Sequence, residues 1–176
     1  MNNKPTASNG SSLWDFAVAV YGRGGVAAAC LELQESCHVD VPLFLAVGFA
    51  ICRGKALDAS ALSALEQRAG PWRRDVVQAL RAIRRRLKTG PHPAPNGASE
   101  PLRNAVKAAE LAAEKIQLQV MQDFIDALPA TRRAPNLADL TAALTMVVAH
   151  ANDGPVPDAQ AAGVTLIAEA IWAQHV

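Results

Sequence analysis

Apolar residues recur at helical spacing in every segment of the chain that lies between helix breakers. A repeat of three or four residues is the period of a helix that buries one face, and the alternation typical of strands is missing. Glycine, proline and capping residues mark the ends of these segments. The predicted helices span residues 13–21, 26–36, 40–53, 58–69, 72–88, 100–128, 137–150 and 159–174. The pattern therefore predicts an all-α fold, a bundle of about seven or eight helices.

The predicted helix at 100–128 is the longest, and it carries two apolar stripes. One stripe consists of Leu102, Val106, Ala109, Ala113, Ile116, Val120 and Phe124. The other consists of Leu111, Leu118 and Ile125, which repeat every seven residues. A helix that packs on one neighbour needs only one stripe. The second stripe must therefore meet the C-terminal helices, a second copy of the chain or a partner protein, and the intramolecular contact is the simplest of these.

The predicted helix at 72–88 has a basic arc opposite an apolar arc. Its basic arc consists of Arg73, Arg74, Arg81, Arg84, Arg85 and Lys88. We expect the apolar arc to face the core, with Trp72, Leu80, Ile83 and Leu87 buried. The segment carries a net charge of +6, although the whole chain carries only +1. The basic arc is therefore a candidate face for a partner or an anion, unless it is a solvated face that pairs with acids elsewhere in the fold.

Composition and helix breakers divide the chain into three parts. Residues 1–11 are polar and are predicted to be a disordered tail. Residues 12–128 are predicted to form one helical domain with a proline-rich and glycine-rich loop at 89–99. Residues 129–176 are predicted to be a C-terminal helical extension of that domain.

The composition limits the class of protein. Hydrophobic residues make up 51% of the chain and charged residues 19%, which is too apolar for a disordered protein. The longest apolar run, 41–52, is too short to cross a bilayer, so we expect no transmembrane segment, a soluble cytoplasmic protein and a buried central helix at this run. Cys30, Cys37 and Cys52 lie in apolar helical patterns, where we expect reduced thiols packed in the core.

Motifs for metal binding and catalysis are missing from the sequence. It has no Cys-x-x-Cys pair, no His-x-x-x-His pair and no nucleophile motif, so it predicts no metal site, no cofactor and no catalytic residue. Asp40 and Asp58 stand at predicted helix starts, where capping explains them. Trp14 and Tyr21 share a helix face and, with Trp72, are candidates for lining a pocket whose ligand is unknown.

Four stretches of the chain together form a specific signature. They read Leu-Trp-Asp-Phe-Ala-Val-Ala-Val-Tyr at 13–21, Gly-Val-Ala-Ala-Ala-Cys-Leu-Glu-Leu-Gln at 25–34, Pro-Trp-Arg at 71–73 and Leu-Arg-Ala-Ile-Arg-Arg-Arg-Leu-Lys at 80–88. With further matches over roughly residues 12–120, they resemble an uncharacterised proteobacterial family of domains of unknown function. The chain departs from the family pattern at Pro42 and Ala79. The resemblance implies an all-α bacterial cytoplasmic protein, and it implies no reaction.

These observations favour a non-enzymatic interaction or regulatory protein that holds a protein partner, or a second copy of itself, on the basic arc or the second stripe. Reversing the charges of Arg81, Arg84 and Arg85 is then expected to leave the fold intact. A nucleic-acid-associated regulator that uses the basic helix 72–88 is the first alternative, although no aromatic side chain lies in the basic arc to stack on a base. A small-ligand binder or enzyme with a pocket near the N-terminal aromatic residues is the second.

Overall fold

The structure is a computed structural model that describes residues 12–175. Helix accounts for 77% of it, and no strand occurs in the described range, which confirms the all-α prediction. Its elements are α1 (Leu13–Tyr21), α2 (Val26–Cys37), α3 (Val41–Cys52), α4 (Ala59–Trp72), a π-helical turn η1 (Arg73–Val77), α5 (Gln78–Thr89), α6 (Ser99–Ala127), α7 (Leu137–Ala151) and α8 (Asp158–His175). Since α4, η1 and α5 form one continuous rod, the described range holds seven helices. The predicted tail at 1–11 lies outside the described residues.

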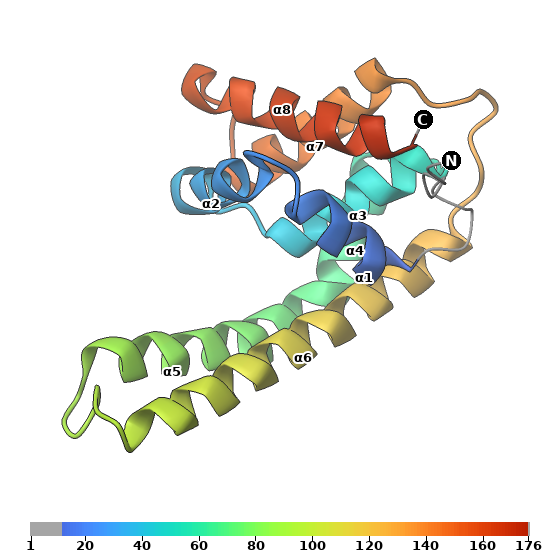
Figure 1. Ribbon diagram of the computed structural model, residues 1–176. Coiled ribbons are helices and arrows are strands. Elements are labelled where there is room, and N and C mark those ends of the chain that lie inside the picture. The colour runs from blue at the N-terminus through green and yellow to red at the C-terminus, as the bar shows by residue number, and fades with distance from the viewer. Residues whose placement is uncertain (1–11, 176) are drawn as a thin grey trace, which may run out of the picture.

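Helix α3 is the buried centre of the body of the molecule, as its apolar sequence predicts. All residues from 43 to 52 are buried, and α1, α6, α7 and α8 pack against them (Figure 1). A Cβ atom added at Gly48 would lie only 2.8 Å from Cδ1 of Ile171, so α3 and α8 are in close contact. In the described range no single helix is long and apolar enough to cross a membrane. Only α1 and α2 taken together have the length and composition of a membrane-spanning segment, and the two helices are bent by 100° relative to each other.

One apolar cluster joins the N-terminal and C-terminal parts of the chain. It contains side chains of α1 to α4, of the second half of α6, and of α7 and α8. Helix α2 packs on both α7 and α8, and α7 packs on α8. The C-terminal helices therefore complete the same core that α3 begins.

The outer end of the rod and the first part of α6, residues 72–116 in all, form an arm that projects from the body (Figure 1). Helix α5 runs outward, the chain turns at residues 90–98, and α6 runs back along α5. No residue of α5 is buried, whereas α6 buries Leu118, Met121 and Ile125 where it enters the body. At 1.5 Å per residue, the 29 residues of α6 are about 43 Å long.

The helix break predicted at Gly70–Pro71 is wrong, because α4 continues through the proline. Pro71 has no N–H to donate to the helix. The N–H of Arg73, two residues later, bonds to the carbonyls of Ala69 and Gly70, so the helical hydrogen bonds continue after the proline. The wider π turn of η1 follows at once. The basic residues of α5 are therefore carried on a rod that begins inside the body.

Of the two aspartates predicted to cap helices, Asp58 does so and Asp40 does not. Asp58 accepts a hydrogen bond from the backbone N–H of Ala61, and Ser12 caps α1 in the same way by accepting from the N–H of Asp15. Asp40 forms no capping hydrogen bond, although α3 begins directly after it. Its carboxylate instead accepts hydrogen bonds from Arg73 and Gln117 at the base of the arm.

Candidate functional site

The basic residues of α5 are partly neutralised inside the arm. Arg81 donates from Nε to Oε1 of Glu110 at 2.9 Å and from Nη2 to Oε1 of Glu114 at 2.6 Å. Arg84 donates from Nε to Oε2 of Glu110 at 2.5 Å. Because the Glu110 side chain is only 8% exposed, one buried carboxylate joins both arginines across the seam between α5 and α6.

The two glutamates of this seam have pKa values shifted in opposite directions. Burial raises the pKa of Glu110, but the hydrogen bonds and charges of Arg84 and Arg81 outweigh burial and hold the pKa below its usual value. Burial also raises the pKa of Glu114, and there the charge of Arg81 does not compensate. The ionised form of Glu110 is therefore stabilised at the seam. The ionised form of Glu114 is destabilised by burial despite its ion pair with Arg81.

A second polar cluster fixes the base of the arm. Arg73 of η1 forms ion pairs with Glu66 of α4 and with Asp40, whose Oδ2 lies 3.2 Å from Nη1. Gln117 of α6 donates from Nε2 to the same Asp40 oxygen at 2.9 Å. Burial raises the pKa of Asp40 although Arg73 opposes the shift. Oε1 of Gln117 is buried and has no hydrogen-bond partner among residues 12–175.

The six basic residues predicted to bind a partner fall into two groups of three. Arg73, Arg81 and Arg84 are half-buried and ion-paired, whereas Arg74, Arg85 and Lys88 are exposed and form no ion pair within the described range. Half of the basic arc thus pairs with acids elsewhere in the fold, which is the structural alternative that the sequence left open. The other half is free to meet an anion or an acidic partner.

The expectation that the apolar arc of 72–88 faces the core is wrong. Trp72 is 36% exposed and Ile83 is 50% exposed, while Leu80 and Leu87 are half-buried. The physical reason is that α6 packs on α5 at the boundary between the two arcs. The two leucines therefore share the seam with the paired arginines, and the rest of the apolar arc stays in contact with solvent.

One flank of α6 is apolar and exposed along the projecting half of the helix. Its residues are Leu102, Ala105, Ala109, Ala112 and Ile116, and all five are exposed. Leu102 is 56% exposed and Ile116 is 50% exposed. The spacing alternates between three and four residues, which is the pattern of a coiled-coil seam that faces another helix.

The exposed flanks of α5 and α6 lie on the same side of the arm. Each residue of a helix is rotated by about 100° from the one before, so Ile83 lies opposite Arg81 and Ile116 lies opposite Glu114. Because Arg81 bonds to Glu114, the two charged flanks share one side of the arm and the two apolar flanks share the other. We call Trp72, Ala79, Ile83, Leu102, Ala105, Ala109, Ala112 and Ile116 the apolar side of the arm. A hollow lined by Gln34 of α2 and by Arg81 places the charged side toward the body.

The three aromatic residues predicted to line a pocket are divided between two places. Trp14 and Tyr21 line one cleft of about 420 Å³ between α1, α3 and α6. Trp72 lies outside this cleft, and its Nε1 donates to the carbonyl of Ala113 at 3.0 Å. Trp72 therefore joins the rod to α6 instead of lining the pocket.

The seven-residue stripe of α6 contributes to both the core and the cleft. Leu118 is 4% exposed and Ile125 is fully buried, so their partners belong to this chain, as the intramolecular alternative describes. Leu111 is 52% exposed and lines the cleft together with Leu118. Tyr21 and Glu114 supply the polar groups of the cleft. The arrangement suits an apolar group that carries a hydrogen-bond donor at one end.

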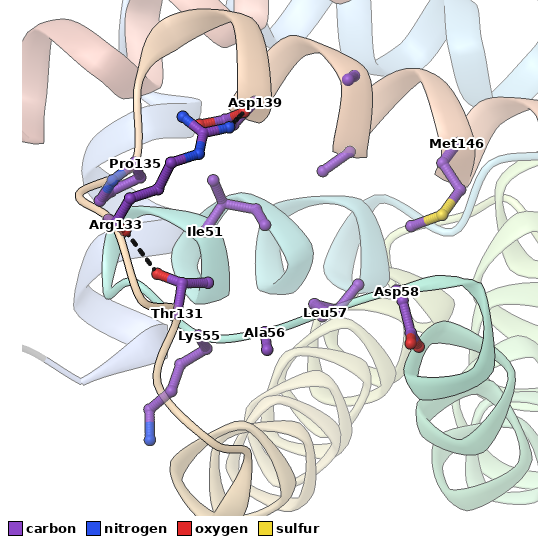
Figure 2. Close-up of a pocket in the computed structure, with 12 residues that line it drawn as sticks. Ile51, Lys55, Ala56, Leu57, Asp58, Thr131, Arg133, Pro135, Asp139 and Met146 are labelled. Atoms are coloured by element: carbon purple, nitrogen blue, oxygen red, sulfur yellow. Dashed lines mark hydrogen bonds and ion pairs between the residues drawn. The ribbon is translucent and has the colours of Figure 1, made fainter.

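A second cavity, of about 470 Å³, lies between the α3–α4 loop and the α6–α7 loop. Figure 2 shows Arg133 reaching Asp139 at one end and Met146 at the other. Each charged group around the cavity has a partner in the chain. Arg133 pairs with Asp139 at 2.5 Å, Lys55 donates to two backbone carbonyls, and Asp58 caps α4. No sequence signal indicated this cavity, because the two loops that form it are far apart along the chain.

The predicted burial of the three thiols is confirmed. Cys30, Cys37 and Cys52 are buried and unbridged. Burial raises the pKa of Cys30 to about 11 and the pKa of Cys52 to about 12, which keeps both thiols protonated at neutral pH. Among residues 12–175, no three His, Cys, Asp or Glu side chains gather closely enough to hold a metal ion.

The sequence of the chain matches a known family model. The sequence model of DUF2390, described as a protein of unknown function, matches residues 12–121. The chain belongs to the DUF2390 family. The DUF2390 match confirms the resemblance seen in the sequence, and it contains the arm, both polar clusters and the Trp14–Tyr21 cleft. No curated protein and no solved structure matches the chain. The DUF2390 description names no activity.

Proposed function

We propose that this DUF2390 protein is a non-enzymatic interaction protein that binds a helical protein partner on the apolar side of its arm. The observation that carries the proposal is the placement of its exposed large apolar residues. Four of them, Trp72, Ile83, Leu102 and Ile116, lie on this one side of two helices, and each is at least 36% exposed. Contiguous exposed apolar surface of this kind marks an interaction site, whereas scattered exposed residues do not.

The construction of the arm supports this assignment. Two antiparallel helices alone bury little apolar surface, and bundles bury such flanks against further helices. In this arm the seam contains ion pairs beside the half-buried Leu80 and Leu87. The large apolar residues Ile83, Leu102 and Ile116 face outward. A partner helix laid along the apolar side would cover them without disturbing the ion pairs.

The basic helix supports a nucleic-acid partner less well. Its paired arginines are already neutralised by Glu110, Glu114 and nearby acids. The exposed residues Arg74, Arg85 and Lys88 leave only a small positive patch, and nucleic-acid affinity rises with the number of phosphates that are neutralised.

The cleft at the base of the arm supports a second candidate function, the binding of a small apolar ligand. The specific observation is that Trp14 and Tyr21 stand over a floor that includes Leu45 and Leu118. Titration of alkyl amines and alkyl carboxylates, followed by tryptophan fluorescence, tests this candidate. We expect a saturable change that the Trp14→Phe variant abolishes. A response that is absent, or that persists in the variant, would remove the candidate.

Site-specific photo-crosslinking in cells that express the protein tests the proposed function. A photo-reactive residue replaces Ala109, on the apolar side, and in a matched control it replaces Ala108, which is exposed and is turned about 100° away. We expect a discrete protein adduct from position 109 and none from position 108. Equal adducts from both positions, or no adduct from position 109, would contradict the proposal.

A further inference from the structure

The apolar side of the arm has the features of a surface that binds a second copy of itself. We propose that two chains dock through these sides in antiparallel orientation, α5 against α5 and α6 against α6, to form a four-helix bundle. The inference rests on the proposed function, because it names the helical partner that the same surface would bind. Size and symmetry each support it.

The size of the apolar side is close to what a small dimer needs. The projecting part of α6, residues 99–116, is about 27 Å long at 1.5 Å per residue, and two adjacent helices are about 20 Å wide. Two such faces offer roughly 1,000 Å² in flat projection. Because side chains project from the helices, the buried surface is larger than its flat projection and approaches the roughly 1,200 Å² at which stable interfaces begin. The arms can therefore form the interface without contribution from the bodies.

The apolar flank of α6 is symmetric about its own middle. Ala109 is the central residue of the stripe, with Leu102 seven residues before it and Ile116 seven residues after it. A twofold axis that crosses the arm at Ala109 places Leu102 of each copy against Ile116 of the other. The alanines between them leave room for the two helices to approach to about 8 Å. One residue set thus forms both halves of the interface.

The ion pairs of the seam place Ile83 at the same level as the middle of the α6 stripe. Arg81 and Arg84 of α5 both donate to Glu110, which is next to Ala109 in the sequence. Ile83 lies between these two arginines in the sequence and is therefore level with Ala109. The same twofold axis brings Ile83 of each copy against Ile83 of the other.

Sedimentation equilibrium of the purified full-length chain is the first test. We expect the mass to rise with concentration from 18.5 kDa toward twice that value. Ile83→Glu should raise the dissociation constant at least about 30-fold, because it places a carboxylate in an apolar interface. Leu31→Glu, which changes a residue of similar exposure on α2, is the matched control and should have no effect. A native chain that remains at 18.5 kDa up to about 1 mM overturns the inference.

An engineered disulfide tests the position of the axis. The three native cysteines are buried, so an added surface thiol is the reactive one. Under mild oxidation Ala109→Cys should form a covalent dimer rapidly, because the two thiols meet at the axis. Ala108→Cys should stay largely monomeric. A dimer that cross-links equally from both positions, or not at all from position 109, contradicts this interface.

The photo-crosslinking result separates the two proposals. A monomeric chain whose position 109 captures a different protein refutes the second copy alone, and a position 109 that captures nothing refutes both.

Discussion

The body and the arm are held together by different forces. The body packs apolar side chains of seven helices into one cluster around α3, and its largest members are almost completely buried. The arm buries no residue of α5, and its seam contains Arg81 and Arg84 against Glu110. The difference shows that apolar residues are abundant in both regions, but the body buries most of them, whereas the arm leaves most of its large apolar side chains half-buried or exposed.

This contrast explains why the arm is the candidate for binding. A helix pair held by ion pairs keeps its shape while its apolar residues remain outside, where a partner can cover them. Ion pairs at a half-exposed seam contribute modestly to stability, whereas burial of each large apolar side chain contributes roughly 1.5–3 kcal/mol. The arm therefore gains most of its available stabilisation only when it is docked.

The largest expected effect is in the body. Ile171→Ala should lower the free energy of unfolding by about 4 kcal/mol, because Ile171 is fully buried against α3. Leu166→Ala, on the same helix but 38% exposed, should cost less than about 1 kcal/mol. Urea denaturation measures both variants. Equal costs would show that α8 is not part of the folding core.

The next largest effect on stability distinguishes two neighbouring arginines of the arm, Arg84 and Arg85. Arg84→Glu should destabilise the arm by about 3 kcal/mol, because it places a second carboxylate against buried Glu110. Arg85→Glu changes an exposed residue and should stay within about 0.5 kcal/mol. The sequence predicts that reversing the charges of Arg81, Arg84 and Arg85 leaves the fold intact. Because Arg81 and Arg84 are ion-paired in the structure, we expect this of Arg85 only. Amide hydrogen exchange of α5 should be faster in the first variant and unchanged in the second, and the opposite order would refute the ionic seam.

Alkaline pH should weaken the body more than the arm. The pKa values of Cys30 and Cys52 are raised from 9.0 to about 11 and about 12, so folding favours the neutral thiols. Their stabilising contribution is complete below pH 9 and is lost as the pH rises through 11. We expect a loss of about 2 kcal/mol between pH 8.5 and 10.5, measured by urea denaturation. Cys52→Ala should reduce this loss, and an unchanged slope would contradict the burial argument.

Acidic pH should open the arm before the body, with a smaller effect. The pKa of Glu110 lies below its ordinary value of 4.5, so its contribution is present above pH 4.5 and is lost as the pH falls below that value. Burial raises the pKa values of Asp40 and Glu114, so these two groups act in the opposite direction. Hydrogen exchange should show that the free energy of opening of α5 is about 1 kcal/mol lower at pH 3 than at neutral pH. Glu110→Gln should abolish the loss of stability at low pH and leave the opposite dependence of Asp40 and Glu114. Amides of α3 that open before those of α5 would refute the comparison.

The sequence predicts the helices, the buried α3 and the buried thiols, because each follows from local apolar spacing. It does not predict where α6 meets the rod. A rotation of α5 about its axis decides which residues enter the seam, and the structure places Leu80 there together with Arg81 and Arg84 while Ile83 stays exposed. Asp40 is a similar case, because a carboxylate before a helix predicts a cap, and only the tertiary position of Arg73 turns it inward.

The apolar side of the arm is likewise hidden from sequence reasoning. Leu102 and Ile116 belong to a stripe that spacing alone assigns to the core. They stay exposed because the helices of the body reach only the second half of α6. Leu118 and Ile125 belong to the second stripe, which the sequence makes a candidate for binding a partner. They lie in the second half of α6 and are buried. Position along the helix, and not periodicity, decides which stripe is free.

Residue-level oxidative footprinting tests most directly whether the apolar side of the arm is a docking surface. The labelling rates of Ile83, Leu102 and Ile116 are compared between dilute purified protein and the protein inside the cells that express it. The exposed body residues Leu31 and Leu166 serve as internal controls. We expect the three arm residues to be labelled more slowly in cells while the two controls are unchanged. Equal labelling of the arm residues in both settings would show that this side of the arm is not a docking surface.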